Sequence, residues 1–227
     1  MESNAWRSLG AEMLAFLLAA ECPGCGRGGT LLCDGCEVLL RPVGVGTRTP
    51  GGVPVRAALP YEGVPARCIR RVKEEGMTLL ARPLGAALRE LLAEQHPALL
   101  VPVPTGRASF RRRGYRVPEL LIARAGARPA RLLRSVRRVG DQRGMGRVQR
   151  ARNVEGSMRA IVASAAREVV IVDDVVTTGA TIDEAARALT AAGYRVRGAV
   201  ALAATPRRRE EPRDTTEMDG DNRVNDD

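Results

Sequence analysis

The segment that decides the expected fold is Val169-Val170-Ile171-Val172-Asp173-Asp174-Val175-Val176-Thr177-Thr178-Gly179-Ala180-Thr181. Its first four residues are all β-branched, which is typical of a strand buried on both faces of a parallel sheet. Two carboxylates follow this run, and after them comes a short loop rich in threonine and small residues. A helical pattern begins at Ile182. The segment therefore predicts a buried strand that ends in an acid pair, followed by a loop that opens a helix.

This arrangement is suited to a sugar phosphate. Backbone N–H groups at a helix N-terminus favour a phosphate, and the loop supplies those of Thr178, Gly179, Ala180 and Thr181. The threonine hydroxyls add donors, and the two carboxylates upstream can accept hydrogen bonds from vicinal sugar hydroxyls. The segment lacks both the Gly-Lys-Ser/Thr of a P-loop and the Gly-x-Gly-x-x-Gly of a dinucleotide fold. It predicts a ribose 5-phosphate site; the alternative is an ordinary strand-to-helix turn with threonine caps.

Outward from this segment, strand and helix patterns alternate, which predicts an α/β fold with a parallel sheet flanked by helices. Apolar runs at 98–101 and 196–203 predict further strands, and helical patterns occupy 118–126 and 182–192. From about residue 205 the chain is charged and poor in apolar residues, which predicts disorder. The expected divisions are an N-terminal helix and cysteine element at 1–40, a linker or hood with helices at 41–97, the α/β core at 98–204 and an acidic tail at 205–227.

Two Cys-x-x-Cys pairs precede this core, Cys22 with Cys25 and Cys33 with Cys36. Each such turn offers two sulfurs on one side, and zinc binds four thiolates tetrahedrally. The alternatives are a pair of disulfides or four reduced thiols, and a cytosolic chain disfavours disulfides. The pattern predicts a small structural zinc knuckle, with all four positions filled by cysteine.

The formal net charge is +10, and its distribution is uneven. Residues 101–167 hold 17 arginines against Glu119, Asp141 and Glu155, a net charge of +14. This concentration predicts a local anion site, with 137–153 as a basic flap, although for most single arginines a solvated surface is the alternative. Aromatic residues make up only 3% of the chain, which argues against a protein that stacks single-stranded bases on aromatic rings.

The N-terminal segment contains apolar residues at 9, 13, 16, 17 and 20, which fit one face of a helix. A signal peptide is the alternative, but Glu2 and Glu12 interrupt the required pattern. No apolar run approaches the length of a membrane span. We expect a short helix, a cytoplasmic location and no membrane insertion.

The segment 169–181 resembles the binding motif for phosphoribosyl pyrophosphate (PRPP) of type I phosphoribosyltransferases. The resemblance implies that Asp173 and Asp174 contact the ribose hydroxyls. It also implies that the loop, Thr177, Thr178, Gly179, Ala180 and Thr181, holds the 5′-phosphate. Mg²⁺ would accompany PRPP, and arginines would stabilise charge on the departing pyrophosphate.

Further segments resemble the ComF family, a competence-associated branch of this fold with a four-cysteine element. Its Tyr and Lys-x-x-Gly stretch matches Tyr61, Lys73 and Gly76, whereas its Gly-Phe-Asn-Gln is replaced here by residues 114–117, Gly-Tyr-Arg-Val. In this fold the acceptor lies under a variable hood, which 41–60 and the cysteine element would form. The resemblance assigns the pyrophosphate loop and flap to Val103, Pro104, Thr105, Arg113, Gln142, Arg150 and Asn153.

Two functions follow as hypotheses. The first is an enzyme that transfers a phosphoribosyl group from PRPP with release of pyrophosphate. The second is a non-catalytic ComF-type competence factor, which would bind nucleotide or single-stranded DNA beside a helicase-like partner. The basic segment and the cysteine element are compatible with contacts to a phosphate backbone. The sequence favours the enzyme and identifies no acceptor.

Overall fold

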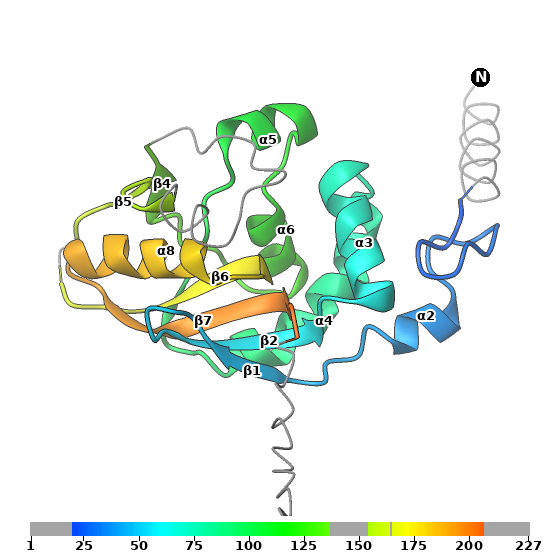
Figure 1. Ribbon diagram of the computed structural model, residues 1–227, viewed down its shortest axis with the longest axis horizontal. Coiled ribbons are helices and arrows are strands. Elements are labelled where there is room, and N and C mark those ends of the chain that lie inside the picture. The colour runs from blue at the N-terminus through cyan, green and yellow to red at the C-terminus, as the bar shows by residue number, and fades with distance from the viewer. Residues whose placement is uncertain (1–19, 137–153, 164, 207–227) are drawn as a thin grey trace, which may run out of the picture.

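The computed structural model describes residues 20–136, 154–163 and 165–206, and its centre is a five-stranded sheet in the order β1-β2-β7-β6-β3 (Figure 1). Strands β2, β7, β6 and β3 run parallel, and β1 pairs antiparallel with β2 at one edge. The strands are β1 Val45–Arg48, β2 Pro54–Pro60, β3 Leu99–Pro102, β6 Glu168–Val176 and β7 Arg195–Ala204. The helices are α2 Asp34–Val38, α3 Gly63–Glu74, the 3₁₀ turn η1 Thr78–Leu80, α4 Ala81–Ala93, α5 Arg107–Arg113, α6 Val117–Arg124 and α8 Ala180–Ala191.

Strand β6 is longer than its β-branched run suggests. It continues through both aspartates to Val176, because Val175 and Val176 pair with Ala203 and Ala204 of β7. The acid pair therefore lies inside the part of β6 that pairs with β7, not after the strand. Helix α8 begins at Ala180, two residues before the expected start at Ile182.

Helices cover both faces of the sheet, as the unalternating strands predict. Alternate residues of β6 point to opposite faces: Val170 and Val172 join one apolar cluster, whereas Val169 and Ile171 join the other. The first cluster is completed by α3, α4 and α6, and the second by α8. The observed fold confirms the predicted α/β class, a mostly parallel sheet flanked by helices with a four-cysteine element at its N-terminal side.

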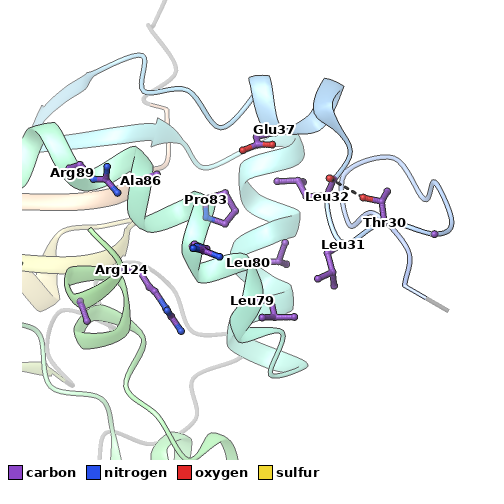
Figure 2. Close-up of a pocket in the computed structure, with 13 residues that line it drawn as sticks. Thr30, Leu31, Leu32, Glu37, Leu79, Leu80, Pro83, Ala86, Arg89 and Arg124 are labelled. Carbon is purple, nitrogen blue, oxygen red and sulfur yellow. Dashed lines mark hydrogen bonds between the residues drawn. The ribbon is translucent and has the colours of Figure 1, made fainter. Parts of the chain in front are cut away.

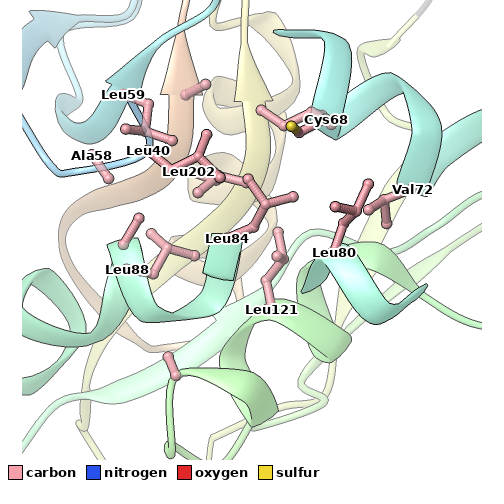
Figure 3. Packing of buried hydrophobic residues seen from close by; sticks show 14 of the residues in the cluster. Leu40, Ala58, Leu59, Cys68, Val72, Leu80, Leu84, Leu88, Leu121 and Leu202 are labelled. Carbon is pink, nitrogen blue, oxygen red and sulfur yellow. The ribbon is translucent and has the colours of Figure 1, made fainter. Parts of the chain in front are cut away.

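The first cluster is built largely from leucine, because the chain has few aromatic residues (Figure 3). Leu84 and Leu88 of α4 contact the sheet beside Leu59 of β2 and Leu202 of β7, and all four are almost fully buried. Truncating one such leucine to alanine typically costs about 2–5 kcal/mol. This helix layer fixes the position of α3, which contributes to the site described below.

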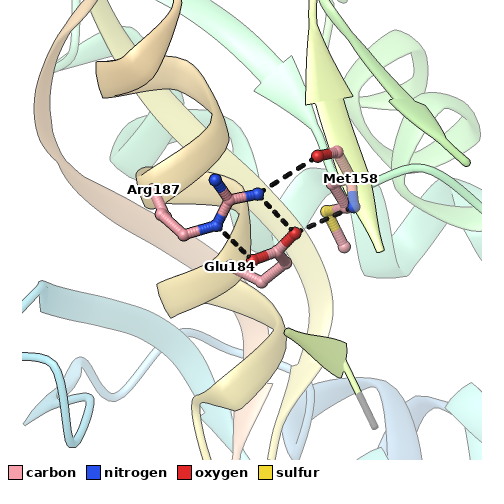
Figure 4. A network of polar contacts seen from close by, with 3 residues as sticks. All are labelled: Met158, Glu184 and Arg187. Atoms are coloured by element: carbon pink, nitrogen blue, oxygen red, sulfur yellow. Dashed lines mark hydrogen bonds and ion pairs between the residues drawn. The ribbon is translucent and has the colours of Figure 1, made fainter. Parts of the chain in front are cut away.

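A small antiparallel pair of strands, β4 (Leu133–Ser135) and β5 (Met158–Ala160), packs against α8. The buried carboxylate of Glu184 accepts the N–H of Met158 at 2.8 Å, and Arg187 donates to both of its oxygens at 2.7 and 2.9 Å (Figure 4). Burial alone would raise the pKa of Glu184, but these hydrogen bonds outweigh burial and hold the pKa below its usual value. The network anchors β5, the strand that follows residues 137–153, to α8.

No helix in the described part of the chain is long and apolar enough to cross a membrane. The helix expected near the N-terminus and the acidic tail expected from 205 fall, apart from Ala20, Thr205 and Pro206, outside the described residues.

Candidate functional site

The acid pair of β6 lies at the carboxyl end of the parallel strands, where open α/β sheets bind ligands. Asp173 and Asp174 are each only 8% exposed. Oδ1 of Asp173 accepts the N–H of Asp174 at 2.8 Å, and Oδ1 of Asp174 accepts a hydrogen bond from the ammonium of Lys73 at 2.9 Å. Of the two buried carboxylates, Asp174 is thus the one that is paired directly with the cation.

The two aspartates differ in their electrostatic environment. Burial, and then the neighbouring carboxylate of Asp174, raise the pKa of Asp173 to about 7. Lys73 opposes this shift, but its direct partner is Asp174. Burial alone would lower the pKa of Lys73, yet the nearby carboxylates raise it above its usual value, so the ammonium stays charged. The site therefore holds one ion-paired carboxylate beside one that titrates near neutrality.

Lys73 belongs to the site, although it is not among the site residues expected from the sequence. It is the only lysine in the chain, and helix α3 carries it to the end of β6, 101 residues away in sequence. Tyr61 lies at the same edge of the sheet, where its N–H donates to the carbonyl of Ala204 at 2.8 Å. The Lys-x-x-Gly resemblance marks Lys73 in the sequence, but only the tertiary fold pairs it with Asp174.

The loop after β6 turns at Gly179, whose φ of +83° lies in the left-handed region. Its carbonyl accepts the N–H of Asp183, and Thr178 Oγ1 accepts the N–H of Ala180 at 3.4 Å. Within the described residues, no partner meets the N–H groups of Gly179, Thr181 or Ile182. Such free N–H groups at the N-terminus of a twelve-residue helix can bind an anion.

The turn between β1 and β2 closes over this loop, a contact that no local sequence signal predicts. The backbone N–H of Gly51 donates to Oδ2 of Asp183 at 3.0 Å. A Cβ on Gly179 would lie 2.9 Å from Cβ of the buried Thr49. Residues 130 positions apart in sequence therefore fix the shape of the loop.

Replacing Gly179 by alanine should destabilise the fold by about 1–3 kcal/mol, because alanine is strained at this φ and its Cβ clashes with Thr49. Thermal or urea unfolding of the variant measures this cost. Gly156 also has a positive φ but nothing within 4 Å of its Cβ position, so Gly156→Ala controls for backbone strain alone. Equal losses in the two variants would contradict a role for the Thr49 contact.

The expected pyrophosphate loop begins beside the acid pair. The N–H of Val103 donates to the carbonyl of Val172 at 2.9 Å, which extends the β3–β6 pairing to the residue before Asp173. Val103 is buried, and Pro104 and Thr105 are half-buried on the way to α5. These three residues and the acid pair therefore lie at the same end of neighbouring strands.

Helix α5 adds cations to this loop, although its arginines vary in exposure. Arg113 is half-buried, and within the described residues its Nε is buried without a hydrogen-bond partner. Immediately beyond it, the hydroxyl of Tyr115 donates to the carbonyl of Val72, the residue before Lys73. The α5–α6 connection is thus tied to α3. The guanidinium of Arg116 lies 4.5 Å from the ring centre of Phe110.

Three expected flap residues lie outside the described residues. They are Gln142, Arg150 and Asn153, and they fall between β4 and β5.

The four cysteines of the N-terminal element converge as predicted. Their sulfurs all lie within 4.8 Å of one another, with 3.8 Å between Cys22 and Cys33 and 3.6 Å between Cys25 and Cys33. Burial raises the pKa of Cys22, but donors among the backbone N–H groups of the element lower it to about 6. Burial and the neighbouring cysteines raise the pKa of Cys36 to about 12. Thiolate is the metal-binding form of cysteine, and a bound cation favours that form, so the converged sulfurs can hold a metal ion.

This element is fastened to the rest of the fold. Gly24 is required there, because a Cβ would lie 2.4 Å from Sγ of Cys36. Arg67 of α3 donates to the carbonyls of Pro23 at 3.2 Å and Gly24 at 2.6 Å. Helix α3 therefore connects the cysteine element at one end with the Lys73–Asp174 pair near its other end.

The sheet, the acid pair at its carboxyl end and the amide-rich loop define an α/β protein with a sugar-phosphate type of site. The family profile of the phosphoribosyl transferase domain matches residues 112–226, and the chain belongs to that family. No curated protein matches the chain.

Several solved structures are similar to part of this chain at low sequence identity. Leishmania donovani UMP synthase is 17% identical, with a TM-score of 0.36 over 60% of this chain; the match spans 24% of that enzyme. An adenine phosphoribosyltransferase is 14% identical, with a TM-score of 0.35 over 74% of this chain and 89% of its own. A hypoxanthine phosphoribosyltransferase from Staphylococcus aureus is 20% identical, with a TM-score of 0.30 over 61% of this chain and 68% of its own.

Proposed function

We propose that this chain binds PRPP with Mg²⁺ and transfers its phosphoribosyl group to an acceptor, with release of pyrophosphate. The observation that carries the proposal is the buried pair Asp173–Asp174 directly upstream of a loop with free N–H groups at the start of α8. The 5′-phosphate would bind Thr177, Thr178, Gly179, Ala180 and Thr181. The two carboxylates would accept hydrogen bonds from the ribose 2′- and 3′-hydroxyls, which orients the anomeric carbon.

In the reaction, the bond from the anomeric carbon to the pyrophosphate oxygen breaks, and pyrophosphate leaves with the electron pair. The acceptor forms the new bond to that carbon and loses a proton. Residues 103–105 and Arg113 would meet the pyrophosphate, whose developing charge guanidinium groups stabilise. Mg²⁺ would supply further charge neutralisation on the pyrophosphate oxygens. Lys73 would keep Asp174 ionised and positioned for the sugar.

Calorimetric titration of the full chain with PRPP, with and without Mg²⁺, tests binding, and a pyrophosphate-release assay with purine, pyrimidine and other amine acceptors tests turnover. We expect Mg²⁺-dependent PRPP binding and weaker binding of ribose 5-phosphate, which lacks the pyrophosphate. Ribose, which lacks both phosphate groups, is the matched negative ligand. Absence of any response to PRPP or nucleotides would refute the proposal.

PRPP affinity should rise with pH through neutrality. Asp173 has a pKa of about 7, so its carboxylate is mostly protonated at pH 6 and mostly ionised at pH 8. If the ionised form is the one that accepts the ribose hydroxyl, the competent fraction and hence the affinity increase about tenfold over this range. Charged groups around it are Asp174 and Lys73.

Titrations at pH 6, 7 and 8 measure this dependence, and Asp173→Asn serves as control because it removes the titrating group. The variant should bind more weakly, and its remaining pH dependence should be that of the PRPP phosphates. An unchanged slope in Asp173→Asn would show that Asp173 is not the titrating group.

We further propose that the chain is a ComF-type member of this family with structural zinc, located in the cytoplasm. The converged cysteines support zinc, whose tetrahedral sites take four thiolates. The resemblance of Tyr61, Lys73 and Gly76 to the ComF stretch supports the ComF assignment. The chain divisions at 40, 97 and 204 stay predictions.

The competing function is a non-catalytic factor that uses the same fold to bind nucleotide or single-stranded DNA beside a helicase-like partner. The excess of arginine in residues 101–167 favours contacts with phosphate. DNA affinity that falls steeply with salt and survives Asp173→Asn/Asp174→Asn, without pyrophosphate release, would favour this function.

A further inference from the structure

An open groove of about 770 Å³ lies between the cysteine element and helix α4 (Figure 2). Its apolar lining includes Leu31 and Leu32 of the cysteine element, Leu79 and Leu80 of η1, and Pro83 of α4. Leu79 is 56% exposed although it lies beside the buried Leu80. None of the residues of the acid-pair site lines this groove, so the proposed function leaves it unused.

The groove also carries an excess of positive charge. Arg82 and Arg89 of α4 and Arg124 at the end of α6 line it together with one acid, Glu37. Within the described residues none of these arginines forms an ion pair. Arg124 reaches this position because Gly85 lets α6 approach α4; a Cβ there would lie 2.5 Å from Cβ of Arg124. An apolar groove flanked by unpaired arginines suits an apolar segment that carries a carboxylate.

The N-terminal part of this chain contains such a segment, which ends just before Ala20, next to the groove. The described part starts at Ala20, which is 8% exposed, and the carbonyl of Ala20 accepts the N–H of Gly29 at 2.8 Å. Gly29 itself lines the groove. The preceding residues are therefore tethered within reach of the groove, whatever their conformation.

The pattern of that segment matches the groove in polarity. Trp6, Leu9, Met13, Phe16 and Leu17 follow the spacing of one helical face, and Ala20 continues it. Glu12 lies at the edge of this face on a helical projection, whereas Arg7 lies on the opposite side. As a helix, residues 6–19 would be about 21 Å long. Left in water, so many large apolar side chains would form an exposed patch of a kind that marks an interaction site.

We propose that residues 6–19 bind in this groove of their own chain as an amphipathic helix, with the face of Trp6, Leu9, Met13 and Phe16 against Leu31, Leu32 and Leu79. Glu12 then lies near the arginines of α4 and α6. Docking in this way adds a contact between the cysteine element and the helix layer to the hydrogen bonds of Arg67. The proposal does not depend on PRPP binding.

Trp6 is the only tryptophan in the chain, so its fluorescence reports on the docked segment. In the full chain we expect blue-shifted emission and slow quenching by acrylamide. Leu79→Asp should shift the emission to the red and raise the quenching constant about twofold or more, because a charge in the groove lining disfavours an aromatic neighbour. Ala86→Arg, a substitution at an exposed helix position that fills the groove, should have the same effect.

Val162→Asp is the matched control, because Val162 is 79% exposed and lies outside the groove. Circular dichroism of each variant establishes that it is folded. Two results would overturn the proposal. In the first, acrylamide quenches Trp6 of the unsubstituted chain as freely as it quenches indole; in the second, neither groove variant changes the emission or quenching of Trp6. Protection that disappears on a roughly hundredfold dilution would also overturn it, since the segment then binds a second copy by mass action.

Discussion

Exchanging both aspartates of the pair, Asp173→Asn/Asp174→Asn, should lower PRPP affinity at least about a hundredfold while the fold persists. Each carboxylate is expected to accept a hydrogen bond from a ribose hydroxyl, and hydrogen bonds to charged groups contribute about 1.5–3 kcal/mol each. Asparagine keeps the shape of aspartate but carries no charge and offers one acceptor oxygen in place of two. Calorimetric titration with PRPP and Mg²⁺ measures the loss.

The same double substitution changes stability by opposing contributions. It removes the repulsion between two buried carboxylates that raises the pKa of Asp173, but it leaves the ammonium of Lys73 without its partner at 2.9 Å. We therefore expect a melting temperature within a few degrees of the unsubstituted chain. Glu168→Gln is the matched control, because Glu168 lies at the opposite end of the same strand. PRPP binding that survives in the double variant would place the ligand elsewhere.

Removing the metal from the cysteine element should have the second large effect. The four cysteines are part of the first apolar cluster or adjoin it: Cys22, Cys33 and Cys36 are buried among Leu40, Val64 and Ile69. Loss of a metal present at about a thousandfold above its Kd costs about 4 kcal/mol of linkage free energy. For a chain of this size that corresponds to roughly 10 °C in melting temperature.

Metal analysis of the purified chain, followed by thermal melting with and without a strong chelator, tests this expectation. We expect one zinc per chain, lost in Cys22→Ser. Cys68→Ala is the control, because Cys68 is a buried thiol that is not one of the four converged cysteines, so its removal should leave the zinc content unchanged. Disulfides in place of metal in the native chain, or melting that a chelator leaves unchanged, would contradict a structural zinc site.

If both expectations hold, helix α3 becomes the element through which the two sites are joined. Arg67 donates to the carbonyls of Pro23 and Gly24, and Lys73, six residues later, pairs with Asp174. Metal loss that frees Arg67 from these carbonyls would then also loosen the helix that positions Lys73. PRPP titrations of the chelated protein would show whether this mechanical connection affects binding.

Local pattern was sufficient for a large part of this protein. Three features depend on residues close together in sequence: the β-branched run at 169–172, the Thr-Thr-Gly loop and the two Cys-x-x-Cys pairs. Composition and spacing therefore predict the buried strand, the helix start to within two residues and the cysteine cluster. The absence of alternation along the strands likewise predicts a sheet covered on both faces, because each side chain of such a strand meets a helix.

The tertiary structure decided what depends on distant residues. Strand β6 extends through Asp173 and Asp174 because β7 pairs with it, and no property of those aspartates signals a strand. The Lys73–Asp174 ion pair spans 101 positions, and the Gly51–Asp183 contact spans 132. Backbone conformation is a local property, whereas charge pairing and burial depend on which segments the fold brings together. The sequence alone thus determined the kinds of site, and packing decided which acid is ion-paired and which titrates near neutral pH.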